Sequence, residues 1–221
     1  MNPFRRVERA RASFLAVVAF ATLIATMSGE AATSAAAATP ATPTETATFS
    51  GGCFWSMNAV FERIAGVRQV TAGFAGGSVP KPSYERVSTG STGHAETVQI
   101  VFDPAVISYR DLLGIFFEFH DPTTLNRQGA DVGEQYRSVI FWHSPEQRAA
   151  AQQAIAELES RRAYRSAIVT QLQPYREFYA AEDYHQNYYD KHSSDGYCRL
   201  VIAPKLEKLH KLHPNQLKAA M

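Results

Sequence analysis

The sequence has 221 residues, 45% of them hydrophobic and 19% charged, which is enough to bury one sizeable core, so one globular domain is expected. The formal net charge is +1 at pH 7, with 22 basic and 21 acidic residues. This balance argues against nucleic acid or an acidic lipid surface as a partner. No internal repeat is found.

The first 31 residues have the composition of a secretory signal peptide. Four arginines precede an uncharged apolar run over 14–27, and the small residues after it suit cleavage near Ala31. An uncleaved membrane anchor is the alternative, although the run is short for a bilayer span. Cleavage would leave 18 basic and 19 acidic residues, and the protein is expected to be exported, to the periplasm.

Residues 32–45 are almost entirely Ala, Thr and Pro. Such a segment has too little apolar side-chain area to offset the entropy lost on ordering, so a disordered linker is predicted. The folded domain is expected to span 46–203, and residues 204–221 are expected to be a C-terminal tail.

Three strands and one helix are predicted in the first half of the domain. A short strand at 47–49 leads to a glycine pair, after which apolar residues recur at helical spacing over 54–64, and the helix stops at Gly66. Two runs rich in β-branched and aromatic residues follow, at 67–75 and 95–102, with Gly, Ser and Pro between them.

Two helices are predicted in the second half. Ser108 can cap one that ends before Pro122, because a residue that precedes proline avoids helical geometry. The segment 144–147 has the cap, N1 proline and capping-box glutamine that open the other, which ends near Arg162.

Strands at 138–142 and 168–172 complete the order β-α-β-β-α-β-α-β. An aromatic stretch over 174–198 is expected to form a long irregular C-terminal segment. Because strands and helices do not alternate strictly, the expected fold class is α+β, a two-layer sandwich with a mixed β-sheet flanked by helices.

The sequence contains two cysteines, Cys53 and Cys198. An exported protein would normally join such a pair into a structural disulfide. Cys53, however, starts a predicted helix, where free N–H groups and the helix dipole stabilise a thiolate, so a lowered pKa and a reactive role are expected. Phe54 and Trp55 beside it would form a pocket for an apolar group such as a methyl, although Phe54 also fits the core-facing stripe of the helix.

Glu96 begins a predicted strand and shares one face with Val98 and Ile100. Desolvation on that apolar face would raise its pKa and make it a general acid, unless the side chain bends into water at the end of the strand. Asp131 and Tyr136 lie at the end of a polar, glycine-containing loop, from which they would orient a substrate oxygen.

The histidines of the domain lack the paired spacing of a metal site, and no Cys-x-x-Cys occurs, so no metal is expected. Two alternatives stay open. In the first, Cys53 is a hydrolytic nucleophile, His94 or His185 is its base, and Asp131 orients that histidine. In the second, the protein is a binding domain in which a Cys53–Cys198 disulfide closes a long loop.

Five separated segments carry a resemblance to a known family. They are Gly-Cys-Phe-Trp at 52–55, Thr-Gly-His-Ala-Glu at 92–96, Asn-Arg-Gln-Gly at 126–129, Gln-Tyr-Arg-Ser at 135–138 and Ala-Glu-Asp-Tyr-His-Gln at 181–186. In this order they resemble the A-type peptide methionine sulfoxide reductases. The resemblance covers about residues 46–203, and it implies that this range is the catalytic domain.

The resemblance implies a thiol-based reduction of methionine sulfoxide, the repair of an oxidised side chain. Cys53 would attack the sulfoxide sulfur, while Glu96, Tyr84 and Tyr136 hold and protonate the oxygen. Asp131 would support the substrate. The S epimer, free or within proteins, is the substrate that the resemblance implies.

The resemblance also implies the rest of the cycle. Phe54 and Trp55 would accept the methyl group of the substrate, and the sulfenic acid left on Cys53 would condense with Cys198 to a disulfide. A thioredoxin-like protein would then reduce this disulfide. No cofactor is implied, and a monomer is expected.

Three residues depart from the pattern usual in that family. Ser56 follows the tryptophan where Gly or Cys is usual, Asn58 stands where Glu is expected, and Ala130 replaces a usual Asn. None of them removes a reacting group, but a missing charge at Asn58, one helical turn beyond Cys53, would tune the environment of the thiolate.

Overall fold

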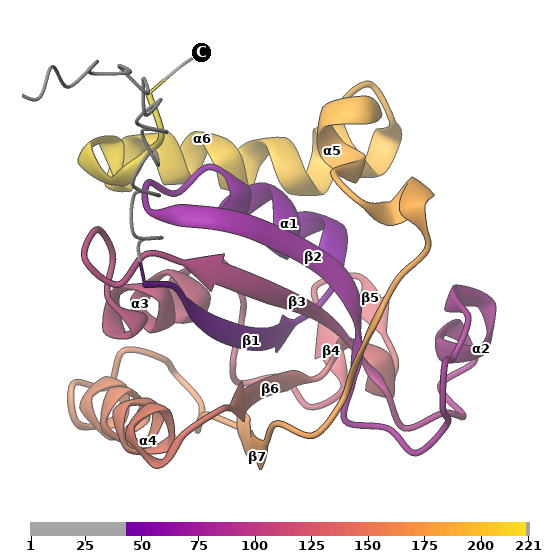
Figure 1. The fold of residues 1–221 in the computed structure, drawn as a ribbon, viewed down its shortest axis with the longest axis horizontal. Helices are drawn as coiled ribbons and strands as arrows, with labels where there is room; N and C mark the ends of the chain where they lie inside the picture. The colour runs from indigo at the N-terminus through magenta and orange to yellow at the C-terminus, as the bar shows by residue number, and fades with distance from the viewer. Residues whose placement is uncertain (1–42, 220–221) are drawn as a thin grey trace, which may run out of the picture. The chain divides into compact units, whose positions relative to one another are not determined.

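The computed structural model describes residues 43–219, which form a six-stranded mixed sheet (Figure 1). The spatial order is β7, β6, β1, β3, β2 and β8, in which β6 and β7 are parallel and every other neighbouring pair is antiparallel. The strands are β1 (Glu45–Gly51), β2 (Val67–Ala75), β3 (Ala95–Phe102), β6 (Ser138–Trp142), β7 (Gln171–Pro174) and β8 (Phe178–Ala180). A separate small hairpin joins β4 (Arg127–Gln128) and β5 (Asp131–Val132).

The helices complete the expected α+β architecture, so the predicted fold class is confirmed. They are α1 (Phe54–Glu62), α2 (Tyr84–Ser88), α3 (Tyr109–Phe119), α4 (Pro145–Ser160), α5 (Tyr188–Lys191) and α6 (Ala203–Leu212). Short 3-10 turns occupy Glu134–Tyr136, Asp183–His185 and Pro214–Gln216, and a π-helical turn occupies Cys198–Ile202. Figure 1 shows α6 alongside α1, with α5 next to them.

The main core lies between the sheet and helices α1 and α3. Phe49 of β1 pairs in register with Val98 of β3, so both side chains point to the same face. On that face the Phe49 ring lies 4.9 Å from Phe116 of α3 and 5.9 Å from Phe61 of α1, measured between ring centroids. All four residues are buried, and full burial of such a side chain stabilises the fold by roughly 1.5–3 kcal/mol. This packing fixes the start of α1 against the sheet.

The opposite face of the sheet is covered by the chain that crosses from β7 to β8. There Ala75, Val139 and Phe141 form a small buried cluster, against which Tyr175 of the crossover and Phe178 at the start of β8 pack. In Figure 1 this orange segment passes in front of the sheet and leads to α5. The crossover thus brings the segment after residue 180 to the end of the sheet where α1 begins.

The predicted helices and strands are found within a few residues, with two differences of detail. The strand predicted at 168–172 is displaced to 171–174, because the backbone N–H of Val169 donates to the Pro122 carbonyl instead of pairing with β6. Ser144 caps α4 as expected, but the Gln147 side-chain oxygen accepts the N–H of His143 and so does not close a capping box on Ser144.

Several elements were not predicted from the sequence. These include α2, α5 and β8, as well as α6, which begins at the last residue of the expected domain and continues into the expected tail at 204–221. Leu206 and Leu209 of α6 are buried, so this helix is part of the packed domain.

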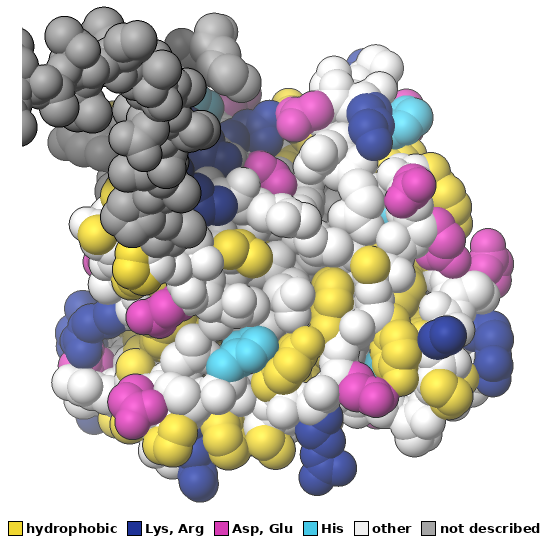
Figure 2. Space-filling view, in the orientation of Figure 1, with side chains coloured by type: hydrophobic (Ala, Val, Ile, Leu, Met, Phe, Trp, Pro, Cys, Tyr) yellow, Lys and Arg dark blue, Asp and Glu magenta, His cyan; other side chains and the backbone are white. Residues whose placement is uncertain are grey.

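The predicted signal peptide over 1–31 and almost all of the linker at 32–45 lie outside the described residues. Within residues 43–219, none of the helices has the length and apolar composition needed to cross a membrane. The face of the domain seen in Figure 2 intersperses acidic, basic and hydrophobic side chains, so no extended area of one charge occurs on it.

Candidate active site

Cys53 lies at the N-cap of α1, immediately after the Gly51-Gly52 turn. Gly52 has a φ of +92°, and a Cβ there would lie 2.4 Å from the Gln128 side chain, so only glycine fits this turn. The Cys53 carbonyl accepts the N–H of Ser56 at 3.1 Å, which starts the helix. Cys53 is 9% exposed, so the residue is largely shielded from solvent.

Glu96 stands beside Cys53 because β3 delivers its carboxyl to the start of α1. Its Oε2 accepts the backbone N–H of Phe54 at 2.9 Å, and the residue is 2% exposed. Burial raises the pKa of the Glu96 carboxyl to about 8, although the Phe54 N–H opposes the change. The carboxyl is therefore largely protonated at neutral pH. The predicted raised pKa is confirmed, and the alternative of a side chain bent into water is not found.

The predicted lowering of the Cys53 pKa is wrong. Burial raises the pKa of this thiol, and the carboxyl of Glu96 raises it further. A Tyr197 hydroxyl and the Trp55 backbone N–H hydrogen-bond to the sulfur and act in the opposite direction. The helix start thus supplies the N–H group expected from the sequence, but the loss of water outweighs it. At rest, Cys53 is a protonated thiol.

Two phenols, Tyr84 and Tyr136, join the site from separate elements. Tyr84 opens α2, and Tyr136 ends the 3-10 turn that follows the β4–β5 hairpin. Burial raises the pKa of both phenols, and the nearby carboxyl of Glu96 adds to the effect, as does the Cys53 thiol. Both hydroxyls therefore keep their protons and are available as hydrogen-bond donors.

Asp131 is linked to Cys53 through Tyr197, a residue that the sequence analysis did not select. The Tyr197 hydroxyl donates to Asp131 Oδ2 at 2.8 Å and is also hydrogen-bonded to the Cys53 side chain. Burial, followed by the Cys53 and Asp131 charges, raises the pKa of Tyr197. The C-terminal segment thereby places a phenol directly at the sulfur.

Phe54 and Trp55 form an aromatic wall beside Cys53. Phe54 is buried and stacks on the Tyr84 ring, with centroids 6.2 Å apart. Trp55 stacks on Tyr188 at 3.7 Å, and its Nε1–H donates to His185 Nδ1 at 3.0 Å. The structure brings both predicted residues to the site, and Phe54 belongs to the core as well.

No histidine is paired with the thiol among the described residues. His94 uses both ring nitrogens structurally, Nδ1 accepting the Gly77 N–H and Nε2 lying 2.8 Å from the Val79 carbonyl. His185 accepts the Trp55 indole N–H, and burial lowers its pKa, so it is neutral. The arrangement that a Cys-His hydrolase needs is therefore not formed.

Cys198 is fully buried at the start of the π-helical turn, and neither cysteine is in a disulfide. Burial raises the pKa of the Cys198 thiol, and the charge of Asp195 adds to this. Its neighbour Tyr197 contacts Cys53, but Cys198 itself packs into the core. The structural-disulfide alternative does not describe this state of the protein.

A family model described as peptide methionine sulfoxide reductase matches residues 45–217. The chain belongs to this family. A peptide methionine sulfoxide reductase of Saccharolobus solfataricus is 56% identical over 174 residues, which is 79% of this chain and 97% of that relative. One from Deinococcus radiodurans is 50% identical and covers 81% of this chain and 87% of that relative. The protein is therefore an oxidoreductase that reduces methionine sulfoxide.

Solved structures of similar enzymes share the fold. The reduced form of Mxr1 from Saccharomyces cerevisiae has a TM-score of 0.64 and 36% identity, over 72% of this chain and 91% of that one. Methionine sulfoxide reductase A of Corynebacterium diphtheriae has a TM-score of 0.62 and 37% identity, over 71% of this chain and 78% of that one. The six-stranded sheet and its helices are thus the fold of this family.

The departures of the reductase from the family pattern have different structural settings. Asn58 is buried, and its Nδ2 donates to the Val70 carbonyl at 3.2 Å, so it anchors α1 to β2. Ser56 is buried too, and its Oγ accepts Lys205 Nζ from α6. Nothing in the structure explains Ala130.

Two site residues, Tyr197 and Tyr188, were not predicted from the sequence. The role of His185 in orienting the Trp55 ring was not predicted either. The aromatic stretch over 174–198 is predicted only as an irregular segment, and aromatic residues in such a segment give no periodic signal that would single out a site residue. The adjacency of Tyr197 to the second cysteine was the available clue, since a residue beside Cys198 must come near Cys53 if the two sulfurs are to meet.

Proposed function

We propose that Cys53 attacks the sulfur of methionine sulfoxide while Glu96 protonates the sulfoxide oxygen. The observation that carries this assignment is a buried carboxyl, protonated at neutral pH, fixed by the Phe54 N–H at the start of the helix that bears the thiol. A neutral carboxylic acid gives a proton to a developing oxyanion, which is the role of a general acid. Tyr84 and Tyr136 add two further donors for that oxygen.

The step balances without a cofactor. The Cys53 sulfur loses two electrons and ends as a sulfenic acid, and the substrate sulfur gains two electrons as its S–O bond breaks and methionine leaves. The oxygen is transferred to Cys53. The proton from Glu96 is replaced by the one that Cys53 releases, so the carboxyl is ready for the next cycle.

The substrate is the S epimer of methionine sulfoxide, free or within a protein. Phe54 and Trp55 offer an apolar wall for the methyl group, and the Trp55 ring is held between Tyr188 and His185. The site sets three constraints on the tetrahedral sulfur: the methyl group lies on this wall, the oxygen lies toward Glu96, and the sulfur faces Cys53 for attack. Together they fix where the remaining substituent points, so one epimer is selected.

Cys198 resolves the sulfenic acid. Its thiolate attacks the Cys53 sulfur, hydroxide leaves as water after protonation, and a disulfide forms. A thioredoxin-like dithiol then reduces this disulfide and is itself oxidised. In the reduced state Cys198 is buried, at the start of the π-helical turn over Cys198–Ile202.

We also propose that the protein is exported and acts in the periplasm. The support is the sequence alone: four arginines, an uncharged apolar run and small residues near Ala31. Expression of the full chain in a Gram-negative host, with intact mass of the periplasmic fraction, tests this. A mass beginning near residue 32 is expected, whereas an uncleaved chain in the membrane fraction contradicts it.

The roles of the cysteines are tested with dabsylated methionine sulfoxide as substrate. With dithiothreitol, the wild type should turn over and Cys53→Ser should not. Cys198→Ser should still form one methionine per enzyme, since its first step is intact, yet fail with thioredoxin as the donor. Equal rates for wild type and Cys53→Ser would rule out Cys53 as the nucleophile.

A further inference from the structure

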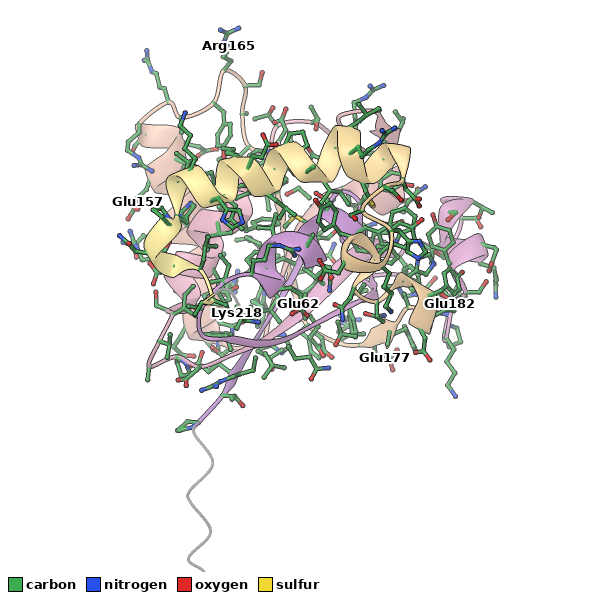
Figure 3. The ribbon with its side chains drawn as sticks, turned by 90° about the horizontal axis from the view of Figure 1, so that it is seen from above. Glu62, Glu157, Arg165, Glu177, Glu182 and Lys218 are labelled. Carbon is green, nitrogen blue, oxygen red and sulfur yellow. The ribbon has the colours of Figure 1, made fainter. Side chains whose placement is uncertain are left out.

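Lys205 reaches from α6 to the first turn of α1. Its Nζ donates to Ser56 Oγ at 2.9 Å, and Ser56 is 2% exposed and donates its own N–H to the Cys53 carbonyl. Figure 3, seen from above, shows α6 lying across α1. Among residues 43–219, no other lysine or arginine side chain hydrogen-bonds to residues 53–57.

This position is electrostatically unfavourable for a cation on its own. Burial lowers the pKa of Lys205, and a positive charge near a helix N-terminus is repelled by the helix dipole. The Cys53 and Asp131 charges act in the opposite direction and raise the pKa of Lys205. A buried ammonium at the start of α1 is thus compensated when negative charge develops at Cys53.

We propose that Lys205 is a positioning residue for the nucleophile, in which the ammonium anchored by Ser56 favours the thiolate of Cys53. The inference rests on the proposed role of Cys53. It gives the Ser56 departure a reason, because glycine at this position has no side-chain acceptor for the ammonium. It also gives α6 a part in the chemistry, because Lys205 belongs to this helix. Lys205 lies seven positions after Cys198.

Other charged groups face the pair and must be the same in every comparison. Glu96 and Asp131 face Cys53, together with the Tyr197 hydroxyl. Lys208 and His120 face Lys205 from α6 and from the end of α3. Burial lowers the pKa of His120 to about 4, so this ring is neutral from pH 6 upward.

The test measures the pH dependence of Cys53 alkylation by iodoacetamide in the full chain carrying Cys198→Ser. Lys205→Gln should move the alkylation midpoint upward by about one pH unit, as the loss of a nearby opposite charge does. At pH 7.5 its alkylation should be roughly tenfold slower than in the parent, because one pKa unit is a factor of ten in thiolate.

Matched variants separate charge from structure. Lys205→Arg should restore the parent midpoint, and Lys211→Gln, an exposed lysine of the same helix, should not change it. Ser56→Ala, which leaves the lysine but removes its anchor, should move the midpoint in the same direction by less. An unchanged midpoint in a folded Lys205→Gln overturns the proposal.

If circular dichroism shows that Lys205→Gln is unfolded, Ser56→Ala decides the question, and an unchanged midpoint in that variant overturns the proposal equally. The Cys198→Ser parent is also given one equivalent of methionine sulfoxide. A parent that alkylates normally but forms no methionine contradicts the proposed function, whereas the Lys205 comparison still reports on the thiolate.

Discussion

The Cys53 thiol and the Glu96 carboxyl meet at the start of α1, and both keep their protons at neutral pH. The resting site therefore has little charge at the atoms that react. When the sulfoxide oxygen accepts the Glu96 proton, the sulfoxide sulfur becomes more electrophilic. The proton that Cys53 loses then replaces the one that Glu96 has given up. Reaction thus begins from two neutral groups whose protons move as the substrate reacts.

A first prediction concerns Glu96→Gln, which keeps an acceptor for the Phe54 N–H but has no acidic proton. Single-turnover formation of methionine should slow by roughly 10²–10⁴-fold, the usual contribution of a general acid. In the wild type, the rate should fall as pH rises through about 8, because the proton is then lost from Glu96. Rapid-quench measurements from pH 6 to 9.5 check both.

The same variant has an opposite effect on thiol ionisation, which serves as its control. Because the Glu96 carboxylate raises the pKa of Cys53, alkylation at pH 9 should be faster in Glu96→Gln than in the wild type. If Glu96→Gln is slow both in methionine formation and in alkylation, its site is distorted. If Glu96→Gln forms methionine at the rate and with the pH dependence of the wild type, Glu96 is not the acid.

Helix α6 carries Lys205 and follows directly on the π-helical turn that begins at Cys198. Leu206 and Leu209 are buried beneath it, while Lys218 beyond its end lies near Glu62 of α1 (Figure 3). Their Nζ–Oε2 distance is 3.8 Å, and exposed pairs of this kind add little stability. The apolar contacts of α6 therefore hold the turn over Cys198–Ile202 in place.

A second prediction tests these contacts. Leu209→Ala should destabilise the protein by about 2–5 kcal/mol, because it removes a buried side chain and leaves a cavity. Leu212→Ala is the matched control, since Leu212 is 47% exposed and should change stability far less. Urea unfolding measures both, and equal effects would show that α6 does not depend on its buried face.

Patterned elements were predictable from the sequence, and the site was predictable in part. Helical periodicity located α1, and runs of β-branched and aromatic residues located β2 and β3, so the positions of Cys53 and Glu96 followed. The sign of the thiol pKa was not predictable, because helix position is visible in a sequence whereas the amount of water removed from a sulfur depends on Tyr197 and other distant residues. α6 was missed because its mixed polar composition resembles an exposed tail.

Burial of the Glu96 carboxyl lowers the free energy of unfolding of the protein above acidic pH. Glu96 has a pKa of about 8 in the folded state against an ordinary value of 4.5. Below pH 4.5 both states hold the proton, so there is no penalty. Between pH 4.5 and 8 the unfolded chain releases it while the folded chain does not, and stability is lost across this window, about 5 kcal/mol in total.

A third prediction follows for global unfolding. Glu96→Gln should have nearly wild-type stability at pH 4 and should become the more stable of the two as pH rises to 8.5. Urea unfolding of both proteins at several pH values measures the difference. Glu159→Gln, at an exposed position of α4, should show no such trend. If the difference in free energy of unfolding between Glu96→Gln and the wild type does not change with pH, the raised pKa of Glu96 is contradicted.

The narrow exposure of Cys53 has a consequence for an enzyme that meets oxidants. Peroxides react with ionised sulfur far faster than with the protonated form, and overoxidation beyond the sulfenic stage destroys a catalytic cysteine. A buried sulfur that is hydrogen-bonded to the Tyr197 hydroxyl, and ionised only weakly in the resting enzyme, is spared this inactivation. The enzyme thus becomes reactive mainly when a damaged side chain fills its site.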